Sequence, residues 1–178
     1  MGDAWRNLDV SGVKWARVGR SGEAGWRPWL GRWAAVFLGT YSPRLDDKGR
    51  IAFPAKYRDE LAGGVVITKG QEHCLYVFPR EDFAVRFAGL SSAPVGSRKV
   101  REALRMLAAG AHDDAPDKQG RVIIPAHLRQ YAGLGRDVVV VGAMSRLEIW
   151  DTQAWTSYQS AKEADFADLD EEVLADLF

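Results

Sequence analysis

Two arginines end the same short motif, Asp-x-x-Gly-Arg, at two places in the chain. The motif starts at Asp46 and again at Asp117, so Arg50 and Arg121 each follow a turn glycine at the start of an apolar stretch. A guanidinium in this position can clamp a phosphate or bind the O6 and N7 atoms of guanine with two hydrogen bonds. It can also form a structural ion pair with the aspartate of its own turn. The residues leave both roles open.

Further basic residues lie beside the two arginines. Arg44 and Lys48 flank Arg50, so we expect positive charge to gather on the first hairpin and Arg50 to contact DNA. Lys118 lies next to Arg121, but two acidic residues precede this motif, and the role of Arg121 stays open. The candidate DNA-binding residues are therefore Arg50, Lys48, Arg44, Arg121 and Lys118.

The other motif residues are expected to shape the turns. Asp46 and Asp117 can cap backbone amides, whereas a carboxylate that faced a phosphate would repel it. Gly49 and Gly120 can adopt the positive φ that such a turn requires. The aspartates and glycines are thus candidates for structural rather than ligand-contacting roles.

No constellation of residues indicates an enzyme. The three histidines, His73, His112 and His127, are scattered, and no Cys/His spacing resembles a zinc site. The chain has neither a Gly-x-x-x-x-Gly-Lys-Ser/Thr phosphate loop nor a Gly-x-Ser-x-Gly elbow. We expect no catalytic residue, no metal and no cofactor.

The two motifs belong to an internal repeat. At a constant offset of 71 the identical pairs are Asp46/Asp117, Gly49/Gly120, Arg50/Arg121, Pro54/Pro125, Ala55/Ala126 and Arg58/Arg129. A one-residue insertion then shifts the offset to 72, at which Leu75–Phe78 matches Leu147–Trp150. Matching residues that keep the same order from Asp46 to Phe78 and from Asp117 to Trp150 indicate a duplicated module.

Each copy predicts the same elements, so the expected fold class is α+β, mostly β. A short apolar strand leaves the turn, and Pro54 or Pro125 then stands where a short helix can begin. The helices are expected to end near Gly63 and Gly133, and two strands follow. The expected strands are Ile51–Phe53, Val65–Thr68 and Leu75–Phe78, then Val122–Ile124, Val138–Val141 and Leu147–Trp150.

An amphipathic helix is expected between the copies, because Val100, Ala103, Leu104 and Leu107 recur at helical spacing. The predicted organisation is an N-terminal extension (1–35), a first repeat (36–90), the linking helix (91–109), a second repeat (110–158) and an acidic tail (159–178).

Charge and cysteine content permit a nucleic-acid binder in the cytoplasm. The net charge is zero, but seven acids and one lysine lie in 162–178, and the body of the chain is mildly positive. The single cysteine, Cys74, and the lack of a signal-peptide pattern favour a reducing compartment. No apolar run is long enough to span a membrane. We expect a cytoplasmic, nucleoid-associated protein.

From Phe37 to about Tyr158 the chain resembles the MraZ family of bacterial transcriptional regulators. Two modules related to the AbrB-type DNA-binding fold each carry an Asp-x-x-x-Arg motif in that family, as at Asp46 and Asp117 here. The stretch F-L-G-T-Y-S-P-R-L-D-D-K-G-R is similar to the family's opening, and G-A-M-S-R-L-E-I-W-D is similar to the strand pair of its second copy.

The resemblance implies a double-psi or swapped-hairpin AbrB-like barrel formed by two tandem repeats with short helices. It implies assembly into a ring-like homo-oligomer that binds double-stranded DNA at short TGGG-type direct repeats upstream of its own gene. Autoregulation of a division and cell-wall gene cluster would follow. The alternatives are an AbrB-like antitoxin or transition-state regulator, and an oligomeric protein-binding scaffold.

Residues 1–35 are expected to lie outside the repeats. They hold five of the seven tryptophans in a Gly/Arg-rich stretch without strand or helix periodicity. Family members begin Met-Phe-x-Gly, and this chain reads Val36-Phe37-Leu38-Gly39, so a GTG start at Val36 would make 1–35 translated upstream DNA. A disordered basic arm is the alternative.

Under that hypothesis the extension encodes the operator. Trp15-Ala16 must be written TGG-GCN, which forces TGGG, and three other residue pairs permit TGGG at ten-nucleotide steps, about one turn of B-DNA. Those pairs are Ser11-Gly12, Val18-Gly19 and Ser21-Gly22. The nucleotide sequence of the gene tests this hypothesis, because other codons at these three pairs would exclude the regularly spaced TGGG repeats.

Overall fold

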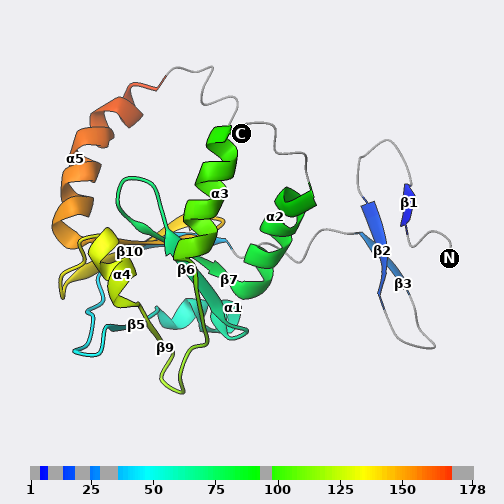
Figure 1. The fold of residues 1–178 in the computed structure, drawn as a ribbon, viewed down its shortest axis with the longest axis horizontal. Coiled ribbons are helices and arrows are strands. Elements are labelled where there is room, and N and C mark those ends of the chain that lie inside the picture. Colours follow the sequence, from blue (N-terminus) through cyan, green and yellow to red (C-terminus); the bar gives the residue numbers. More distant parts are fainter. Residues whose placement is uncertain (1–4, 8–13, 19–24, 29–35, 93–97, 170–178) are drawn as a thin grey trace. The chain divides into compact units, whose positions relative to one another are not determined.

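The structure, a computed structural model, describes residues 5–7, 14–18, 25–28, 36–92 and 98–169 (Figure 1). The chain divides into two units, Met1–Ala34 and Ala35–Phe178. In the first unit, β1 (Trp5–Asn7), β2 (Lys14–Val18) and β3 (Gly25–Pro28) form an antiparallel sheet in that order. The sequence of this unit shows no clear alternation of apolar and polar residues, so these strands are not expected from it. The origin of 1–35 as translated upstream DNA stays a prediction.

The second unit is built on a six-stranded antiparallel sheet. Its strands are β4 (Phe37–Tyr41), β6 (Val65–Lys69), β7 (Leu75–Pro79), β8 (His112–Asp114), β10 (Val138–Met144) and β11 (Leu147–Asp151). They lie in the order β4-β10-β11-β7-β6-β8. Because the repeat relates β4 to β8, β6 to β10 and β7 to β11, this order reads the same from either edge.

The two repeats exchange their first strands. β4 of the first repeat pairs with β10 of the second, and β8 of the second pairs with β6 of the first. Each hairpin, β6–β7 or β10–β11, therefore receives its outer neighbour from the other copy. The expected α+β fold, mostly β and made of two interleaved repeats, is confirmed.

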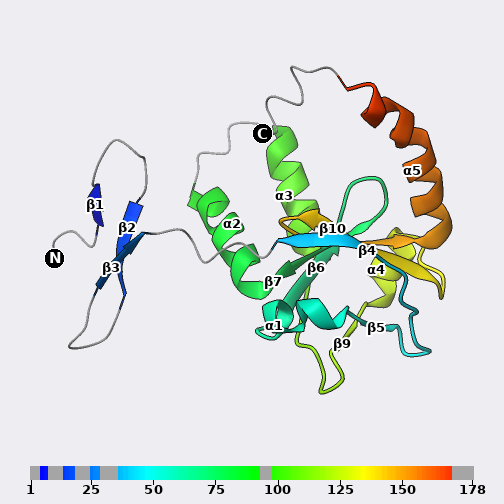
Figure 2. The same ribbon diagram turned by 180° about the vertical axis from the view of Figure 1, so that it is seen from behind.

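A two-stranded ribbon, β5 (Arg50–Ala52) with β9 (Arg121–Ile123), closes the core from below the sheet (Figures 1 and 2). At its centre Ile51 lies opposite Val122, and both side chains are buried. A single hydrophobic core joins them to residues of both repeats, including Phe37, Ile67 and Leu147.

Short helices follow the ribbon strands, as expected. The 3-10 turn η1 (Ala55–Tyr57) and α1 (Arg58–Leu61) come after Pro54, and α4 (Ala126–Tyr131) comes after Pro125. Each proline takes the position just before the first helical turn, where the missing N–H leaves no helical bond unmade. All six expected strands are present, with ends that differ by up to three residues.

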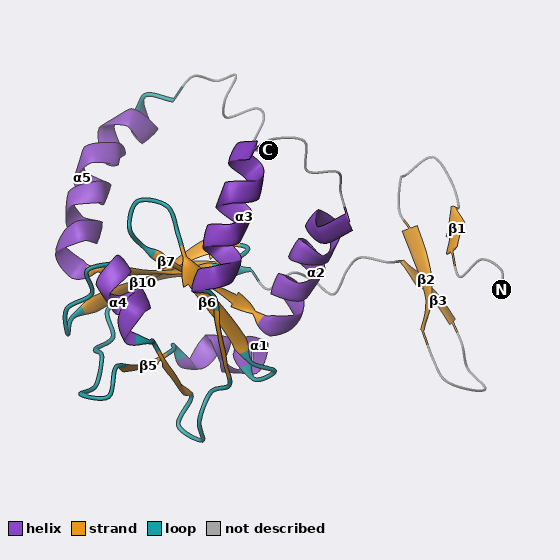
Figure 3. Cartoon of the chain, in the orientation of Figure 1, coloured by secondary structure: helices purple, strands orange, loops and turns teal. Residues whose placement is uncertain are grey.

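Three longer helices lie on the other side of the sheet (Figure 3). The expected linking helix is present as α3 (Arg98–Gly110). Neither α2 (Arg80–Ser92) nor the start of α5 (Thr152–Ala167) is expected from the sequence, because the few apolar residues at helical spacing, such as Phe83 and Phe87, do not form a clear amphipathic stripe. Residues 170–178 of the expected acidic tail lie outside the described part of the chain.

Candidate nucleic-acid interface

The first arginine turn is organised around the carboxylate of Asp46. Its Oδ1 accepts the backbone N–H of Lys48 and of Arg50, both at 2.9 Å, while the N–H of Gly49 donates to the Asp46 carbonyl at 2.8 Å. Gly49 has a φ of +73°, the left-handed region that favours glycine. Sequence and geometry thus agree on a turn that needs an aspartate first and a glycine fourth.

The second turn repeats this arrangement. Oδ1 of Asp117 accepts the N–H of Gln119 at 2.8 Å and of Arg121 at 3.0 Å, and Gly120 has a φ of +72°. The N–H of Gly120 donates to the Asp117 carbonyl at 2.8 Å, the same distance as in the first turn. The duplication is therefore conserved down to individual hydrogen bonds.

Each aspartate also holds the guanidinium of its own motif. In the first turn, Nε and Nη2 of Arg50 both lie 2.7 Å from Oδ2 of Asp46. In the second, Nε and Nη2 of Arg121 lie 2.8 and 2.7 Å from Oδ2 of Asp117. About a third or less of each arginine side chain is exposed, at 27% and 29%.

These contacts keep both carboxylates ionised at neutral pH. Hydrogen bonds from the backbone and side chain of Arg50 lower the pKa of Asp46, and the N–H of Lys48 adds to the effect. The side chain of Arg121, followed by its backbone N–H, lowers the pKa of Asp117 to about 2. Each carboxylate orients its guanidinium through two of the five N–H donors and leaves the other three available.

Both arginines lie on one exposed face of the β5–β9 ribbon. Arg50 is opposite Ile123 and Ala52 is opposite Arg121, so these four side chains share the face turned away from the core. We call them the ribbon face. Ala52 and Ile123, the two small or apolar members, are exposed. By strand geometry the two arginine Cα atoms are roughly 8 Å apart.

The ribbon face can contact the edges of bases or phosphates. Asp46 uses the Nε–Nη2 edge of Arg50, and the N–H groups of Nη1 have no partner among the described residues. The structural ion pair and a contact to DNA are therefore compatible in the same arginine. The aspartate fixes the side chain, and the outer end of the guanidinium stays available for two parallel hydrogen bonds.

The other sequence-predicted cations differ in their surroundings. Lys48 and Lys118 are exposed, and neither forms an ion pair with a residue that the structure describes. Nε of Arg44 lies 2.6 Å from a carboxylate oxygen of Asp137, in an ion pair that is largely exposed. Arg44 is thus bound to the second repeat rather than directed only to solvent.

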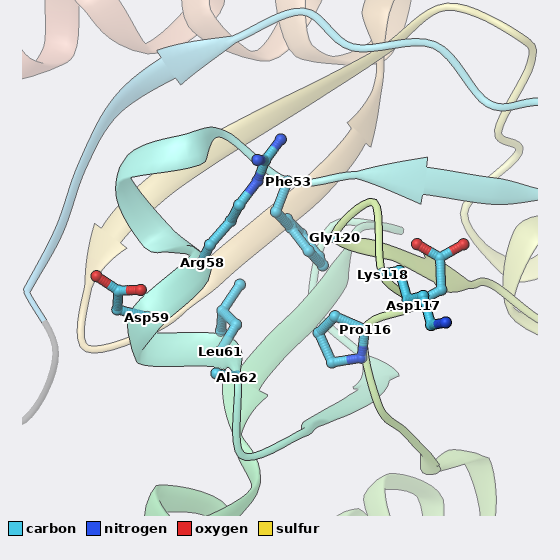
Figure 4. Close-up of a pocket in the computed structure, with 9 residues that line it drawn as sticks. All are labelled: Phe53, Arg58, Asp59, Leu61, Ala62, Pro116, Asp117, Lys118 and Gly120. Atoms are coloured by element: carbon cyan, nitrogen blue, oxygen red, sulfur yellow. The ribbon is translucent and has the colours of Figure 1, made fainter.

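Two basic residues that the sequence left undecided, Arg58 and Arg129, lie beside the turns. Arg58 lines an open pocket of about 280 Å³ between the first repeat's helix and the second repeat's turn, with Phe53, Asp117 and Lys118 (Figure 4). The signal for both arginines was in the sequence, because they are an identical pair of the repeat. Their proximity to the opposite turns was not.

The described residues include neither a candidate metal site nor a reactive thiol. No group of three or more His, Cys, Asp or Glu side chains there could hold a metal ion. Burial raises the pKa of the Cys74 thiol to about 12, so it is not a ready nucleophile. None of the described helices has the length and apolar character needed to cross a membrane.

Comparison with known proteins matches this architecture. A family model described as "MraZ protein, putative antitoxin-like" matches residues 36–106 and again 107–177. A protein named Transcriptional regulator MraZ from Salinispora arenicola is 59% identical over 142 residues, which are 80% of this chain and all of that protein. Its namesake from Thermobifida fusca is 60% identical over 139 residues, or 78% of this chain and 97% of that protein.

A third relative is somewhat less similar in sequence. The protein of the same name from Micrococcus luteus is 53% identical over 143 residues, 80% of this chain and all of that protein. Both copies of the duplicated module match the family model, and the relatives share more than half of their residues over nearly their whole length. The chain therefore belongs to the MraZ family.

Proposed function

We propose that this protein is a sequence-specific DNA-binding regulator of transcription, and that the ribbon face is the surface that contacts DNA. One observation carries the proposal: two arginines, each oriented by its own aspartate, lie on the same exposed face of a two-stranded ribbon. A two-stranded ribbon fits the major groove of B-DNA, where arginine is the usual reader of guanine. The names of the relatives agree with this role.

The charges around the ribbon support binding to the phosphate backbone. Lys48 and Lys118 extend from the two turns, and Arg58 is exposed beside the second turn. Contacts of this kind are not specific for sequence, and they make affinity fall steeply as salt concentration rises. Base recognition would come from Arg50 and Arg121, while the lysines contribute attraction and register.

The target and the assembly are part of the same proposal. The protein binds short TGGG-type direct repeats upstream of its own gene, in the division and cell-wall cluster, as a ring-like homo-oligomer. Direct repeats about one helical turn apart lie on one side of the duplex, so neighbouring subunits can each contact one repeat. Linking several weak contacts raises the overall affinity without any new contact.

The test is a binding titration of the full chain on labelled DNA from upstream of its own gene. We expect tight binding that weakens at least tenfold between 50 and 200 mM salt, the range expected for several phosphate contacts. The same DNA with each TGGG scrambled is the control and should bind much more weakly. Equal affinity for both DNAs would contradict sequence-specific binding. Absence of salt-sensitive binding to either would favour a protein-binding scaffold instead.

A further inference from the structure

Arg58 and Arg129 occupy the same position in the two repeats, and each crosses to the turn of the other repeat. A Cβ atom placed on Gly49 would lie 2.8 Å from Cζ of Arg129, and one placed on Gly120 would lie 3.0 Å from Nε of Arg58. Each guanidinium therefore packs directly against the glycine of the opposite turn. Both contacts use the bare backbone face that only glycine offers.

The two contacts differ in burial. Nε of Arg129 is buried and has no hydrogen-bond partner, whereas Arg58 is an exposed residue. Burial of a guanidinium nitrogen without a partner is unfavourable, and such groups are rare in folded proteins. Arg129 must therefore make a favourable contact that offsets the cost of burying this nitrogen. The guanidinium packs against Gly49, in the turn that carries Arg50.

The first turn is attached to the second repeat by further contacts. The N–H of Leu45 donates to the Arg136 carbonyl at 2.9 Å, Arg44 pairs with Asp137 at 2.6 Å, and Arg136 lies 3.7 Å from Asp47. Together with Arg129 these contacts attach the first turn to the second repeat.

The second turn lacks ion pairs at these same positions, although Arg80 of the first repeat pairs with Asp113 at 2.6 Å, four residues before the motif. The repeat places Ala115 and Lys118 where the first copy has Arg44 and Asp47, so neither side chain can supply the same charge. The two turns share their internal hydrogen bonds but differ in how the opposite repeat supports them.

We propose that Arg129 is a positioning residue for Arg50: its guanidinium, packed beneath Gly49, holds the first turn in the arrangement that presents Arg50 to DNA. The inference rests on the proposed function and extends it across the repeat boundary. A helix of the second repeat thereby sets the geometry of the recognition turn of the first. Arg58 is exposed and packs against Gly120 of the second turn, so we expect it not to position Arg50.

A double-mutant cycle tests this coupling. Arg129→Met keeps side-chain length but removes the planar cation, and Arg50→Ala removes the recognition arginine. We expect Arg129→Met to weaken binding to the upstream DNA about tenfold, a change of about 1.4 kcal/mol. In the Arg50→Ala background the same substitution should change affinity less than about twofold, because no Arg50 is left to position. If the fold-changes in affinity caused by Arg129→Met and Arg50→Ala multiplied in the double variant, the inference would be overturned.

Arg58→Met is the matched control. It removes the same charge at the repeat-related position, so any general electrostatic contribution to DNA binding should appear in both variants. Its effect should multiply with that of Arg50→Ala, within about twofold. Equal coupling of Arg58 and Arg129 to Arg50 would show that the cycle reports total charge, and would overturn the specific role of Arg129.

Arg129→Lys separates charge from shape and serves if Arg129→Met fails to fold. Lysine keeps the positive charge but lacks the planar group that packs beneath Gly49. We expect binding as weak as that of Arg129→Met, with a circular-dichroism spectrum like that of the wild type. Wild-type affinity in this variant would overturn the inference. If Arg50→Ala itself left affinity unchanged, the proposed function would fail instead.

Discussion

At the level of single residues, the aspartate of each turn orients the arginine of the same turn. A free arginine side chain loses rotamer freedom when it binds, and that loss reduces affinity. Here Oδ2 of Asp46 holds Nε and Nη2 of Arg50 at 2.7 Å before any ligand is present. Under the proposed function, this ion pair would favour a contact with DNA as well as stabilise the turn.

Replacement of Arg50 by Ala is expected to lower affinity for the upstream DNA by about 10- to 100-fold, since a bidentate contact to a base contributes about 1–3 kcal/mol. Arg98→Ala, on α3 and away from the ribbon, is the control. It removes the same charge, and its exposed ion pair with Glu102 contributes little, so affinity should change less than about threefold. Fluorescence anisotropy titrations of both variants measure this. Similar losses in the two would mean that only total charge matters.

Asp117 should make stability depend on pH in the acid range. Its pKa is lowered in the folded state to about 2 from an unfolded value of about 3.9, so the folded state is favoured whenever Asp117 is ionised. This contribution is complete above about pH 4 and is lost as the pH falls toward 2. The difference in urea midpoint between wild type and Asp117→Asn should therefore shrink over that window. A constant difference would contradict the assignment.

At the level of elements, the β5–β9 ribbon determines where the two turns point. Ile51 and Val122 face the core and lock the ribbon to the sheet, while the ribbon face stays outside. A sequence register shift of one residue in either strand would exchange these faces and bury an arginine. Packing of the buried face is thus a condition for presentation of the arginines.

Ile51→Ala should destabilise the protein by about 2–5 kcal/mol, because it leaves a cavity at a fully buried position. Ile123→Ala, in the adjacent strand, removes the same atoms from the ribbon face, where the side chain is 41% exposed. That change should cost less than about 1 kcal/mol. Urea unfolding followed by circular dichroism compares the two. Equal losses would show that the ribbon is inverted or detached.

The sequence predicts the two strands of the ribbon, but neither their pairing across the repeats nor the surroundings of the turns. Internal identity at a 71-residue offset locates both motifs, and short apolar runs locate the strands. The approach of Arg129 to Gly49 depends on the crossing of two repeats in space, which no local pattern encodes. The ion pair of Arg44 with Asp137 could not be predicted from the sequence for the same reason. α5 leaves only one local signal, an N-cap at Asp151 that accepts two backbone N–H groups.

At the level of the whole molecule, strand exchange makes the two repeats one folding unit. Neither hairpin has its outer neighbour within its own copy, since β4 pairs with β10 and β8 pairs with β6. A repeat by itself would expose two unpaired strand edges and half of the shared core.

The isolated first repeat, residues 36–90, should therefore fold only by pairing with a second copy. In such a pair β4 of one copy would take the place of β8 beside β6 of the other. Light scattering should give an even number of copies, and circular dichroism should show loss of structure on dilution. A stable folded monomer would contradict the importance of the exchange.

The sheet order that reads the same from both edges also bears on the polarity of the complex. Because the ribbon face has nearly twofold symmetry, it can bind an asymmetric site in either of two orientations. The positions of Arg50 and Arg121 are exchanged between these orientations. Only the unmatched positions, such as Ala52 against Ile123 and Lys48 against Gln119, distinguish the two poses. These few differences between the two repeats would then determine the orientation of the bound protein on a promoter.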